Sequence, residues 1–147
     1  MRFENGLLFV DGRFVRGGFS VENGRFARVL EPPLPGEPRT DLGGAAVIPG
    51  LVDIHTHGCC GADFSDGDLA GLAKMARYLA QNGVTGFAPA SMTLPYGVLE
   101  TAFRTAVQMH REPPAGCARL MGIHMEGPFL SEKKKGAQNA EYLRLPD

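Results

Sequence analysis

The chain has 147 residues, 44% of them hydrophobic and 21% charged, a balance typical of a folded globular protein. Its formal net charge of −1 excludes bulk electrostatic attraction to nucleic acid or to an acidic membrane surface. No apolar run approaches the ~20 residues of a membrane-spanning helix, and the first residues lack the apolar stretch of a signal peptide. The three cysteines, two of them adjacent, do not make a disulfide framework. We therefore expect a cytoplasmic protein with no nucleic-acid or membrane partner.

The first 50 residues carry the pattern of short strands separated by turns. Apolar and alternating stretches predict four strands, over 6–10, 13–16, 19–22 and 25–30. Asp11-Gly12 and Asn23-Gly24 predict two-residue hairpin turns, because these dipeptides accept the backbone angles that such turns need. Residues 31–39 contain four prolines and predict a loop. Residues 1–50 are therefore predicted to form a β-rich segment.

Beyond Pro49-Gly50 the pattern changes to alternating strands and helices. Strands are predicted over 51–54, 84–88 and 119–125, and amphipathic helices over 68–82 and 96–110. This order is typical of parallel βα units, which classes residues 51–147 as α/β. Three strands are too few to close a parallel (β/α)8 barrel, and an open doubly wound sheet commonly has more. We therefore expect that the chain is an incomplete protein, such as a fragment or a truncated gene product.

Two histidines follow the first of these strands, in the segment Asp53-Ile54-His55-Thr56-His57. Residues i and i+2 of a strand project to the same face, so His55 and His57 can present two imidazoles to one cation. Imidazole is a common ligand of zinc, iron, nickel and copper. The alternative interpretation is two polar residues in a loop, but a mount at the end of a buried strand favours a metal site.

Glu126 follows the third strand and precedes Gly127-Pro128, so the chain turns immediately after it. In parallel α/β folds the carboxyl ends of the strands face the active site, which makes Glu126 a candidate metal ligand beside the histidines. A carboxylate in a surface turn is the alternative. His124 shares a face with Glu126, and it either supports a ligand from behind or packs within the strand.

These segments resemble a known family. Residues 49–58, Pro-Gly-Leu-Val-Asp-Ile-His-Thr-His-Gly, are similar to the opening barrel strand of the amidohydrolase superfamily. Residues 122–130, Gly-Ile-His-Met-Glu-Gly-Pro-Phe-Leu, with Lys134-Lys135-Gly136-Ala137-Gln138-Asn139, resemble a signature of the N-acetylglucosamine-6-phosphate deacetylases. The family fold is a (β/α)8 TIM-type barrel with a small β-sandwich built from both chain ends. The resemblance thus implies that 1–50 belongs to the sandwich and 51–147 to the first barrel units.

The resemblance also implies a set of site residues. Glu126 matches the principal metal ligand, and His55 and His57 match a pair that holds a second metal in some members, so one or two divalent ions, zinc or iron, are expected. Two further histidine ligands and the general-base aspartate are expected on later strands, outside this sequence. Ala137 and Gln138 match positions that contact the sugar. Histidine is common at the second position; glutamine still donates and accepts hydrogen bonds but carries no charge.

The implied reaction is metal-dependent hydrolysis of the acetamide of N-acetylglucosamine 6-phosphate to acetate and glucosamine 6-phosphate. By the same resemblance the 147-residue chain alone is expected to be inactive, and the full-length enzyme to be a homo-oligomer. One alternative is an amidohydrolase that acts on another cyclic amide, and another is a non-catalytic remnant. Lys133, Lys134 and Lys135 fit a solvated loop better than a phosphate-steering patch, and Cys59 and Cys60 fit free thiols better than metal ligands.

Overall fold

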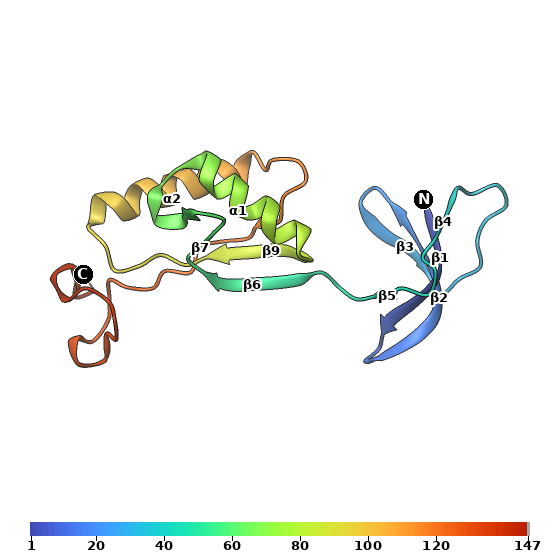
Figure 1. Ribbon diagram of the computed structural model, residues 1–147, viewed down its shortest axis with the longest axis horizontal. Coiled ribbons are helices and arrows are strands. Elements are labelled where there is room, and N and C mark those ends of the chain that lie inside the picture. The colour runs from blue at the N-terminus through green and yellow to red at the C-terminus, as the bar shows by residue number, and fades with distance from the viewer. Residues whose placement is uncertain (147) are drawn as a thin grey trace. The chain divides into compact units, whose positions relative to one another are not determined.

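The computed structural model describes residues 1–146, which divide between Pro49 and Gly50 into two units (Figure 1). This division coincides with the point at which the sequence changes from strand and turn patterns to alternating strands and helices. In the described residues, neither helix combines the length and the apolar character that crossing a membrane requires.

A single five-stranded sheet makes up the first unit. Its strands are β1 (Arg2–Val10), β2 (Arg13–Glu22), β3 (Arg25–Val29), β4 (Arg39–Asp41) and β5 (Ala46–Val47). The order is β3-β2-β1-β4, and β5 pairs with β1 beyond β4, so the two short strands follow each other along one edge of β1. Both predicted hairpin turns are confirmed, because Asp11, Gly12, Asn23 and Gly24 all have positive φ. A second sheet layer is not seen in residues 1–49, so the sandwich assignment stays a prediction.

One continuous strand, β2, replaces the two separate strands predicted over 13–16 and 19–22. Gly17 and Gly18, which separate the two predicted strands, lie within the extended strand. A Cβ added at Gly17 would lie 2.5 Å from Cδ2 of Leu30, and one at Gly18 would overlap the carbonyl oxygen of Phe3. Glycine is present here because neighbouring groups approach the backbone closely, and not because the chain turns.

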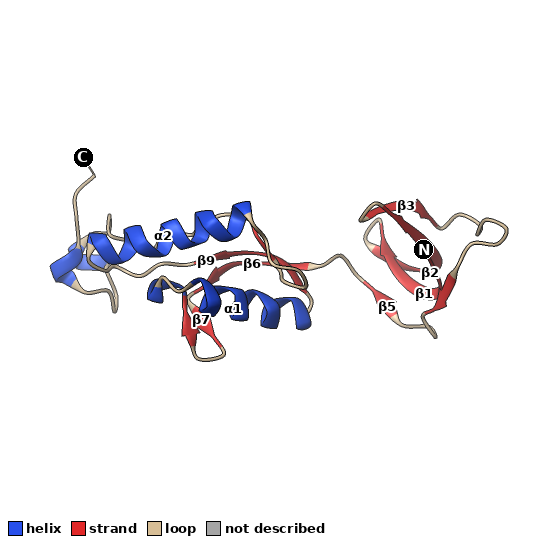
Figure 2. Ribbon diagram, turned by 90° about the horizontal axis from the view of Figure 1, so that it is seen from above, coloured by secondary structure: helices blue, strands red, loops and turns tan. Residues whose placement is uncertain are grey.

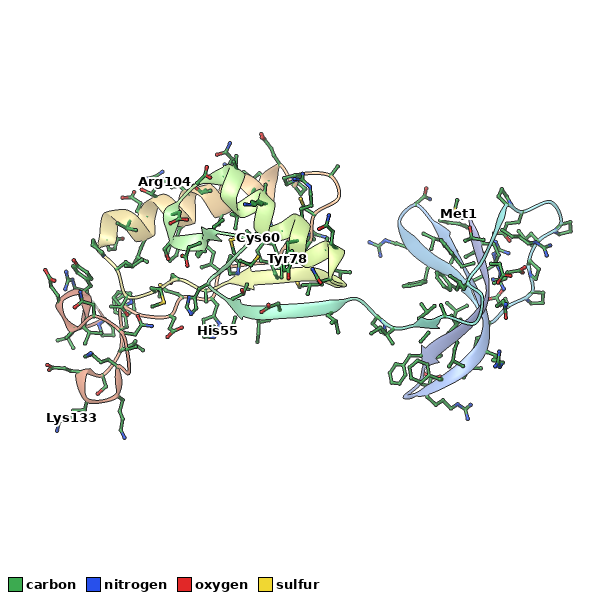
Figure 3. The ribbon with its side chains drawn as sticks, in the orientation of Figure 1. Met1, His55, Cys60, Tyr78, Arg104 and Lys133 are labelled. Atoms are coloured by element: carbon green, nitrogen blue, oxygen red, sulfur yellow. The ribbon has the colours of Figure 1, made fainter. Side chains whose placement is uncertain are left out.

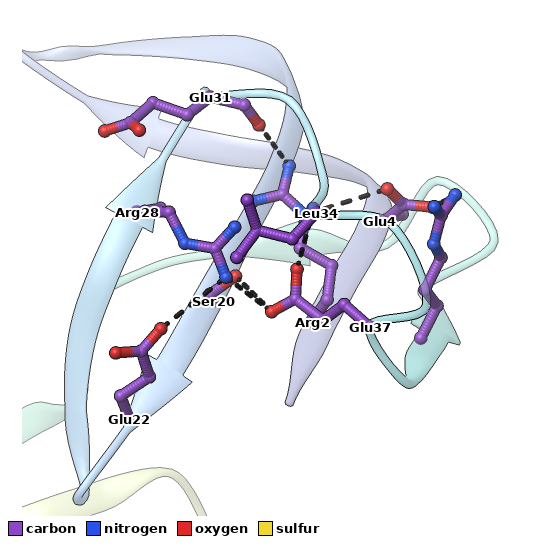
Figure 4. A network of polar contacts seen from close by, with 9 residues as sticks. Arg2, Glu4, Ser20, Glu22, Arg28, Glu31, Leu34 and Glu37 are labelled. Carbon is purple, nitrogen blue, oxygen red and sulfur yellow. Dashed lines mark hydrogen bonds and ion pairs between the residues drawn. The ribbon is translucent and has the colours of Figure 1, made fainter.

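A polar network ties the 31–39 loop to the sheet (Figure 4). The carboxylate of Glu37 accepts hydrogen bonds from Arg28 Nη2 at 2.6 Å, Ser20 Oγ at 3.0 Å and the Leu34 amide at 3.2 Å. Buried Arg2 donates to the carbonyl oxygen of Glu31 at 2.5 Å. Burial disfavours the Glu37 carboxylate, but the bonds from Arg28, Leu34 and Ser20 outweigh it and lower the pKa of Glu37 from 4.5 to about 2.

This network should make the first unit sensitive to acid. Because the folded pKa of Glu37 is lowered, its ionised form stabilises the fold above about pH 4.5, and this contribution is lost as the pH falls toward 2. We expect Glu37→Gln to flatten the fall in the urea midpoint between pH 6 and pH 2.5. Glu22→Gln is the control, because Glu22 also faces Arg28 Nη2 but at 3.5 Å and is 57% exposed. An unchanged pH profile for Glu37→Gln would contradict this role.

The second unit places two helices on one face of a three-stranded parallel sheet (Figures 1 and 2). The sheet order is β10-β9-β6, with β6 (Leu51–Thr56), β9 (Val84–Pro89) and β10 (Arg119–Leu120). The helices are α1 (Leu69–Gln81) and α2 (Tyr96–Arg111), close to their predicted bounds. A hairpin of β7 (Gly58–Cys59) and β8 (Ala62–Asp63) and a 3-10 turn, η1 (Phe64–Asp66), connect β6 to α1. Two further 3-10 turns follow β10, η2 (Glu132–Lys134) and η3 (Ala140–Tyr142).

The core of this unit lies between the helices and β9. Asp68 caps α1, its side chain accepting from the amides of Ala70 and Gly71, and Gly83 with φ of 83° follows its end. The buried side chains of both helices recur at helical spacing, and most of them form one cluster with Phe87 of β9: Leu72, Met75, Ala76 and Leu79 on α1, and Ala102, Ala106 and Met109 on α2. This packing fixes β9, and the parallel ladder with β9 holds β6 beside it, so that the carboxyl ends of both strands lie at the same edge of the sheet.

The third strand is shorter than the predicted 119–125, because β10 covers only Arg119–Leu120. The chain nevertheless continues beside β9: the amide of Met121 donates to Phe87 O at 2.8 Å, and that of His124 to Pro89 O at 2.9 Å. Residues 121–123 between these bonds are not assigned to a strand. The backbone after β10 therefore still leads to the end of β9, although it is not a regular strand.

The sheet of the second unit is open. In the described residues β6 pairs only with β9, and its Leu51, Val52 and Ile54 are each more than half exposed. A closed barrel is therefore not visible here. Both helices cover the same face of the sheet, which is the arrangement of barrel units and differs from a doubly wound fold with helices on both faces.

Candidate metal centre

Two histidines lie at the carboxyl end of β6, where Figure 3 shows His55. His55 lies within β6 and His57 follows it, and their ring centroids are 5.3 Å apart. His57 Nδ1 lies 3.1 Å from the carbonyl oxygen of Ala90, at the end of β9. A carbonyl oxygen only accepts, so Nδ1 carries a hydrogen and Nε2 is the nitrogen left to bind a metal. This contact from behind the ring is typical of a histidine prepared to bind a metal.

Glu126 reaches the histidines from the far side of β9. The amide of Ser91 donates to His124 O at 3.0 Å, which holds the segment leading to Glu126 beside the end of β9. Glu126 Oε2 lies 2.9 Å from His55 Nε2 and 3.3 Å from His57 Nε2. The two outer strands of the sheet thus bring three candidate ligands together across the central one.

The donor set fits a divalent metal. One ligand atom from each of His55, His57 and Glu126 lies within 4.8 Å of the others. Nitrogen and oxygen ligands about 2.0–2.1 Å from a tetrahedral zinc ion are roughly 3.3 Å from one another, close to the 2.9 and 3.3 Å between Glu126 Oε2 and the two histidine Nε2 atoms. The side chains are 48%, 34% and 30% exposed, so the cluster is open on one side. Three protein ligands with an open position are the pattern of catalytic zinc sites.

Ionised Glu126 is the form that this environment favours. Partial burial raises the pKa of Glu126, but hydrogen bonds from Gln138 and His55, with the charges of the histidines, outweigh that effect and lower the pKa overall. A metal binds the carboxylate and not the carboxylic acid, so the lowered pKa is compatible with ligation.

The two predicted sugar contacts lie in different environments. Ala137 is exposed, whereas Gln138 is only 5% exposed and turned inward. Gln138 Nε2 donates to Glu126 Oε1 at 2.6 Å, and its Oε1 accepts from the Thr93 amide at 2.7 Å. The contact to Thr93 was not predicted, because it joins residues 45 positions apart and no local pattern signals it. The sugar contacts themselves stay a prediction.

The other histidine, thiol, carboxylate and lysine side chains near these segments are not members of the cluster. The ring of His124 is 4.4 Å from that of His55, tilted by 50°, and His124 is not one of the three grouped ligands. Cys59, Cys60 and Cys117 are free thiols. Asp63 and Asp66 form the capping box of η1, which gives them a structural role. Lys133 and Lys134 are exposed in η2, while Lys135 Nζ donates to the Gln138 carbonyl at 2.7 Å.

The second unit is thus a parallel α/β fold whose strand ends carry a candidate centre for a divalent metal. The chain matches no family model. It is 34% identical to the N-acetylglucosamine-6-phosphate deacetylase of Mus musculus over 94% of its own length and 36% of the relative. It is 36% identical to the enzyme of that name from Bacillus subtilis, over 70% of its length and 26% of the relative.

Solved structures agree with the sequence relatives. The structure of N-acetylglucosamine-6-phosphate deacetylase from Pasteurella multocida superposes with a TM-score of 0.88 at 25% identity, covering 99% of this chain and 39% of that one. A mutant enzyme of the same name from Mycobacterium smegmatis, in complex with N-acetyl-D-glucosamine-6-phosphate, gives 0.82 at 26% identity, covering 100% of this chain and 38% of that one. The chain belongs to the N-acetylglucosamine-6-phosphate deacetylase family, and it corresponds to the N-terminal portion of these enzymes. It spans about a third of the length of the curated relatives that match most of it.

Proposed function

We propose that His55, His57 and Glu126 are the first metal ligands of a deacetylase. This enzyme would hydrolyse the acetamide of N-acetylglucosamine 6-phosphate, releasing acetate and glucosamine 6-phosphate. The observation that carries the proposal is the convergence of His55, His57 and Glu126 at one end of the sheet, in a chain homologous to deacetylases of that name. We further propose that β6, β9 and β10 are the first strands of a (β/α)8 barrel, that 1–50 belongs to a β-sandwich, and that the enzyme is cytoplasmic and homo-oligomeric.

A divalent cation held here, zinc or iron, would polarise the acetamide carbonyl and activate water near neutral pH. The role of this chain is to present the three ligand atoms and to fix their orientation. His57 is oriented by Ala90 and Glu126 by Gln138. No residue of this chain is assigned as the general base, which we expect on a later strand of the barrel.

A chimera tests the proposal on a working enzyme. Residues 1–146 would replace the corresponding portion of the Mus musculus relative, which matches 94% of this chain, and acetate release from N-acetylglucosamine 6-phosphate would be measured. We expect turnover by the chimera, a fall of at least about 100-fold in its Glu126→Gln variant, and no measurable acetate from the 147-residue chain alone, which contributes no assigned base.

Two alternatives are separated by the same assay. A folded chimera that hydrolyses a cyclic amide but not N-acetylglucosamine 6-phosphate would indicate a different substrate. A folded chimera that hydrolyses neither compound would indicate a non-catalytic remnant. Circular dichroism of the chimera against the parent enzyme confirms folding. Robust acetate release by the 147-residue chain would show that the base lies within it.

A further inference from the structure

Gln138 lies behind Glu126 and is the most deeply buried polar side chain in contact with the cluster. Its amide orientation follows from its partners. The Thr93 amide can only donate, so it must face Oε1 of Gln138, and the ionised carboxylate of Glu126 can only accept, so it must face Nε2. Both polar ends of the side chain are thus used within the protein.

The backbone around Gln138 is held as firmly as its side chain. The backbone amide of Gln138 donates to Lys135 O at 3.2 Å, and the backbone carbonyl of Gln138 accepts from Lys135 Nζ at 2.7 Å. Thr93, which anchors the far end of the side chain, is 2% exposed. The side-chain amide of Gln138 therefore joins three segments: the chain after β9, the chain after β10 and the loop at 135–138.

This arrangement gives the two oxygens of the Glu126 carboxylate different partners. Oε1 is occupied by the hydrogen bond from Gln138, which is strengthened by the negative charge of its acceptor. Oε2 faces both histidine Nε2 atoms and is the oxygen left for a cation. Gln138 thereby favours ligation through one oxygen and holds the carboxylate in that orientation.

We infer that Gln138 is a positioning residue for the metal ligand Glu126, holding its carboxylate through a Thr93–Gln138–Glu126 hydrogen-bond chain. The inference rests on the proposed metal site and differs from the sugar contact that the sequence suggested for this position. Removal of such a supporting partner typically lowers metal affinity by roughly 10–100-fold.

Zinc affinity of the 147-residue chain, measured by competition with a chromogenic chelator, tests the inference. We expect Gln138→Met to bind zinc roughly 10–100-fold more weakly, because methionine keeps the length of the side chain but donates no hydrogen bond. Gln138→His should stay close to wild type, since imidazole can accept from Thr93 and donate to Glu126. Gln108→Met, at an exposed position on α2, is the matched control. Equal zinc affinity for wild type and folded Gln138→Met would overturn the inference and favour a pure sugar contact.

A measurement without metal separates this inference from the proposed function. In ¹⁵N-labelled protein, the side-chain amide signal of Gln138 is assigned by its loss in Gln138→Met. We expect it to shift in Glu126→Ala, where the acceptor is gone, and to stay in place in Glu141→Ala, a matched exposed glutamate. If wild type binds no zinc, the metal site fails, and the amide signal alone decides whether Gln138 holds Glu126. An unshifted signal would reject the inference.

Discussion

The purified 147-residue protein should contain close to one equivalent of zinc or iron, and a His55→Ala, His57→Ala, Glu126→Ala variant should contain none. The three ligand atoms already lie close together, so metal binding requires little rearrangement of the chain. Elemental analysis after exhaustive dialysis measures the difference. We expect Glu126→Ala alone to weaken zinc binding by at least about 100-fold, because it removes the charged ligand that both histidines share.

A histidine outside the cluster provides the control for this experiment. His110 lies on α2, and its Nδ1 is 3.0 Å from the carbonyl oxygen of Leu120. His110→Ala removes one imidazole and leaves the three ligands in place, so its metal content should equal that of wild type. If the triple variant retained the metal, the site would lie elsewhere. If wild type lacked it, residues 1–147 alone would not hold the ion, and the cluster would require the rest of an enzyme.

Local sequence patterns predicted much of the fold because the controlling interactions are local. The Asp11-Gly12 turn and the helix predicted over 68–82 each depend on residues a few positions apart, and both are confirmed, since Asp11 and Gly12 have positive φ and α1 spans Leu69–Gln81 after the Asp68 cap. Gly17 and Gly18 are different. Their role is set by Leu30 and Phe3 on other segments, so glycine alone could not distinguish a turn from a close approach.

The candidate site was likewise predictable where local spacing determines it and not where it depends on distant segments. The i and i+2 spacing of His55 and His57 places two imidazoles together whatever the rest of the fold is. Their contact with Glu126, 71 residues from His55, depends on strand order, which parallel βα units restrict strongly. The inward turn of Gln138 toward Thr93 depends on the path of an irregular loop, and neither periodicity nor resemblance predicted it.

Gly127→Ala should be among the most damaging single changes in the second unit. Gly127 has φ of 80°, and a Cβ there would overlap the Thr93 hydroxyl and lie 3.1 Å from Thr93 Cβ. Left-handed backbone costs alanine about 1–2 kcal/mol, and crowding a packed site adds about 1–3 kcal/mol. Thr93 also anchors Gln138, so its displacement should disturb Glu126 and lower metal affinity as well as stability.

Gly136→Ala separates the two causes, because Gly136 also has positive φ, 60°, but no atom lies within 4 Å of its added Cβ. We expect Gly136→Ala to lose only the backbone cost of about 1–2 kcal/mol, measured by urea unfolding, and to keep its zinc. Thr93→Ser in the Gly127→Ala background should recover little, since the hydroxyl and Cβ that meet the new methyl group remain. Equal losses in Gly127→Ala and Gly136→Ala would mean that Thr93 moves aside freely. The close approach of Thr93 to Gly127 would then not hold Glu126 in place, and the orientation of Glu126 would rest on Gln138 alone.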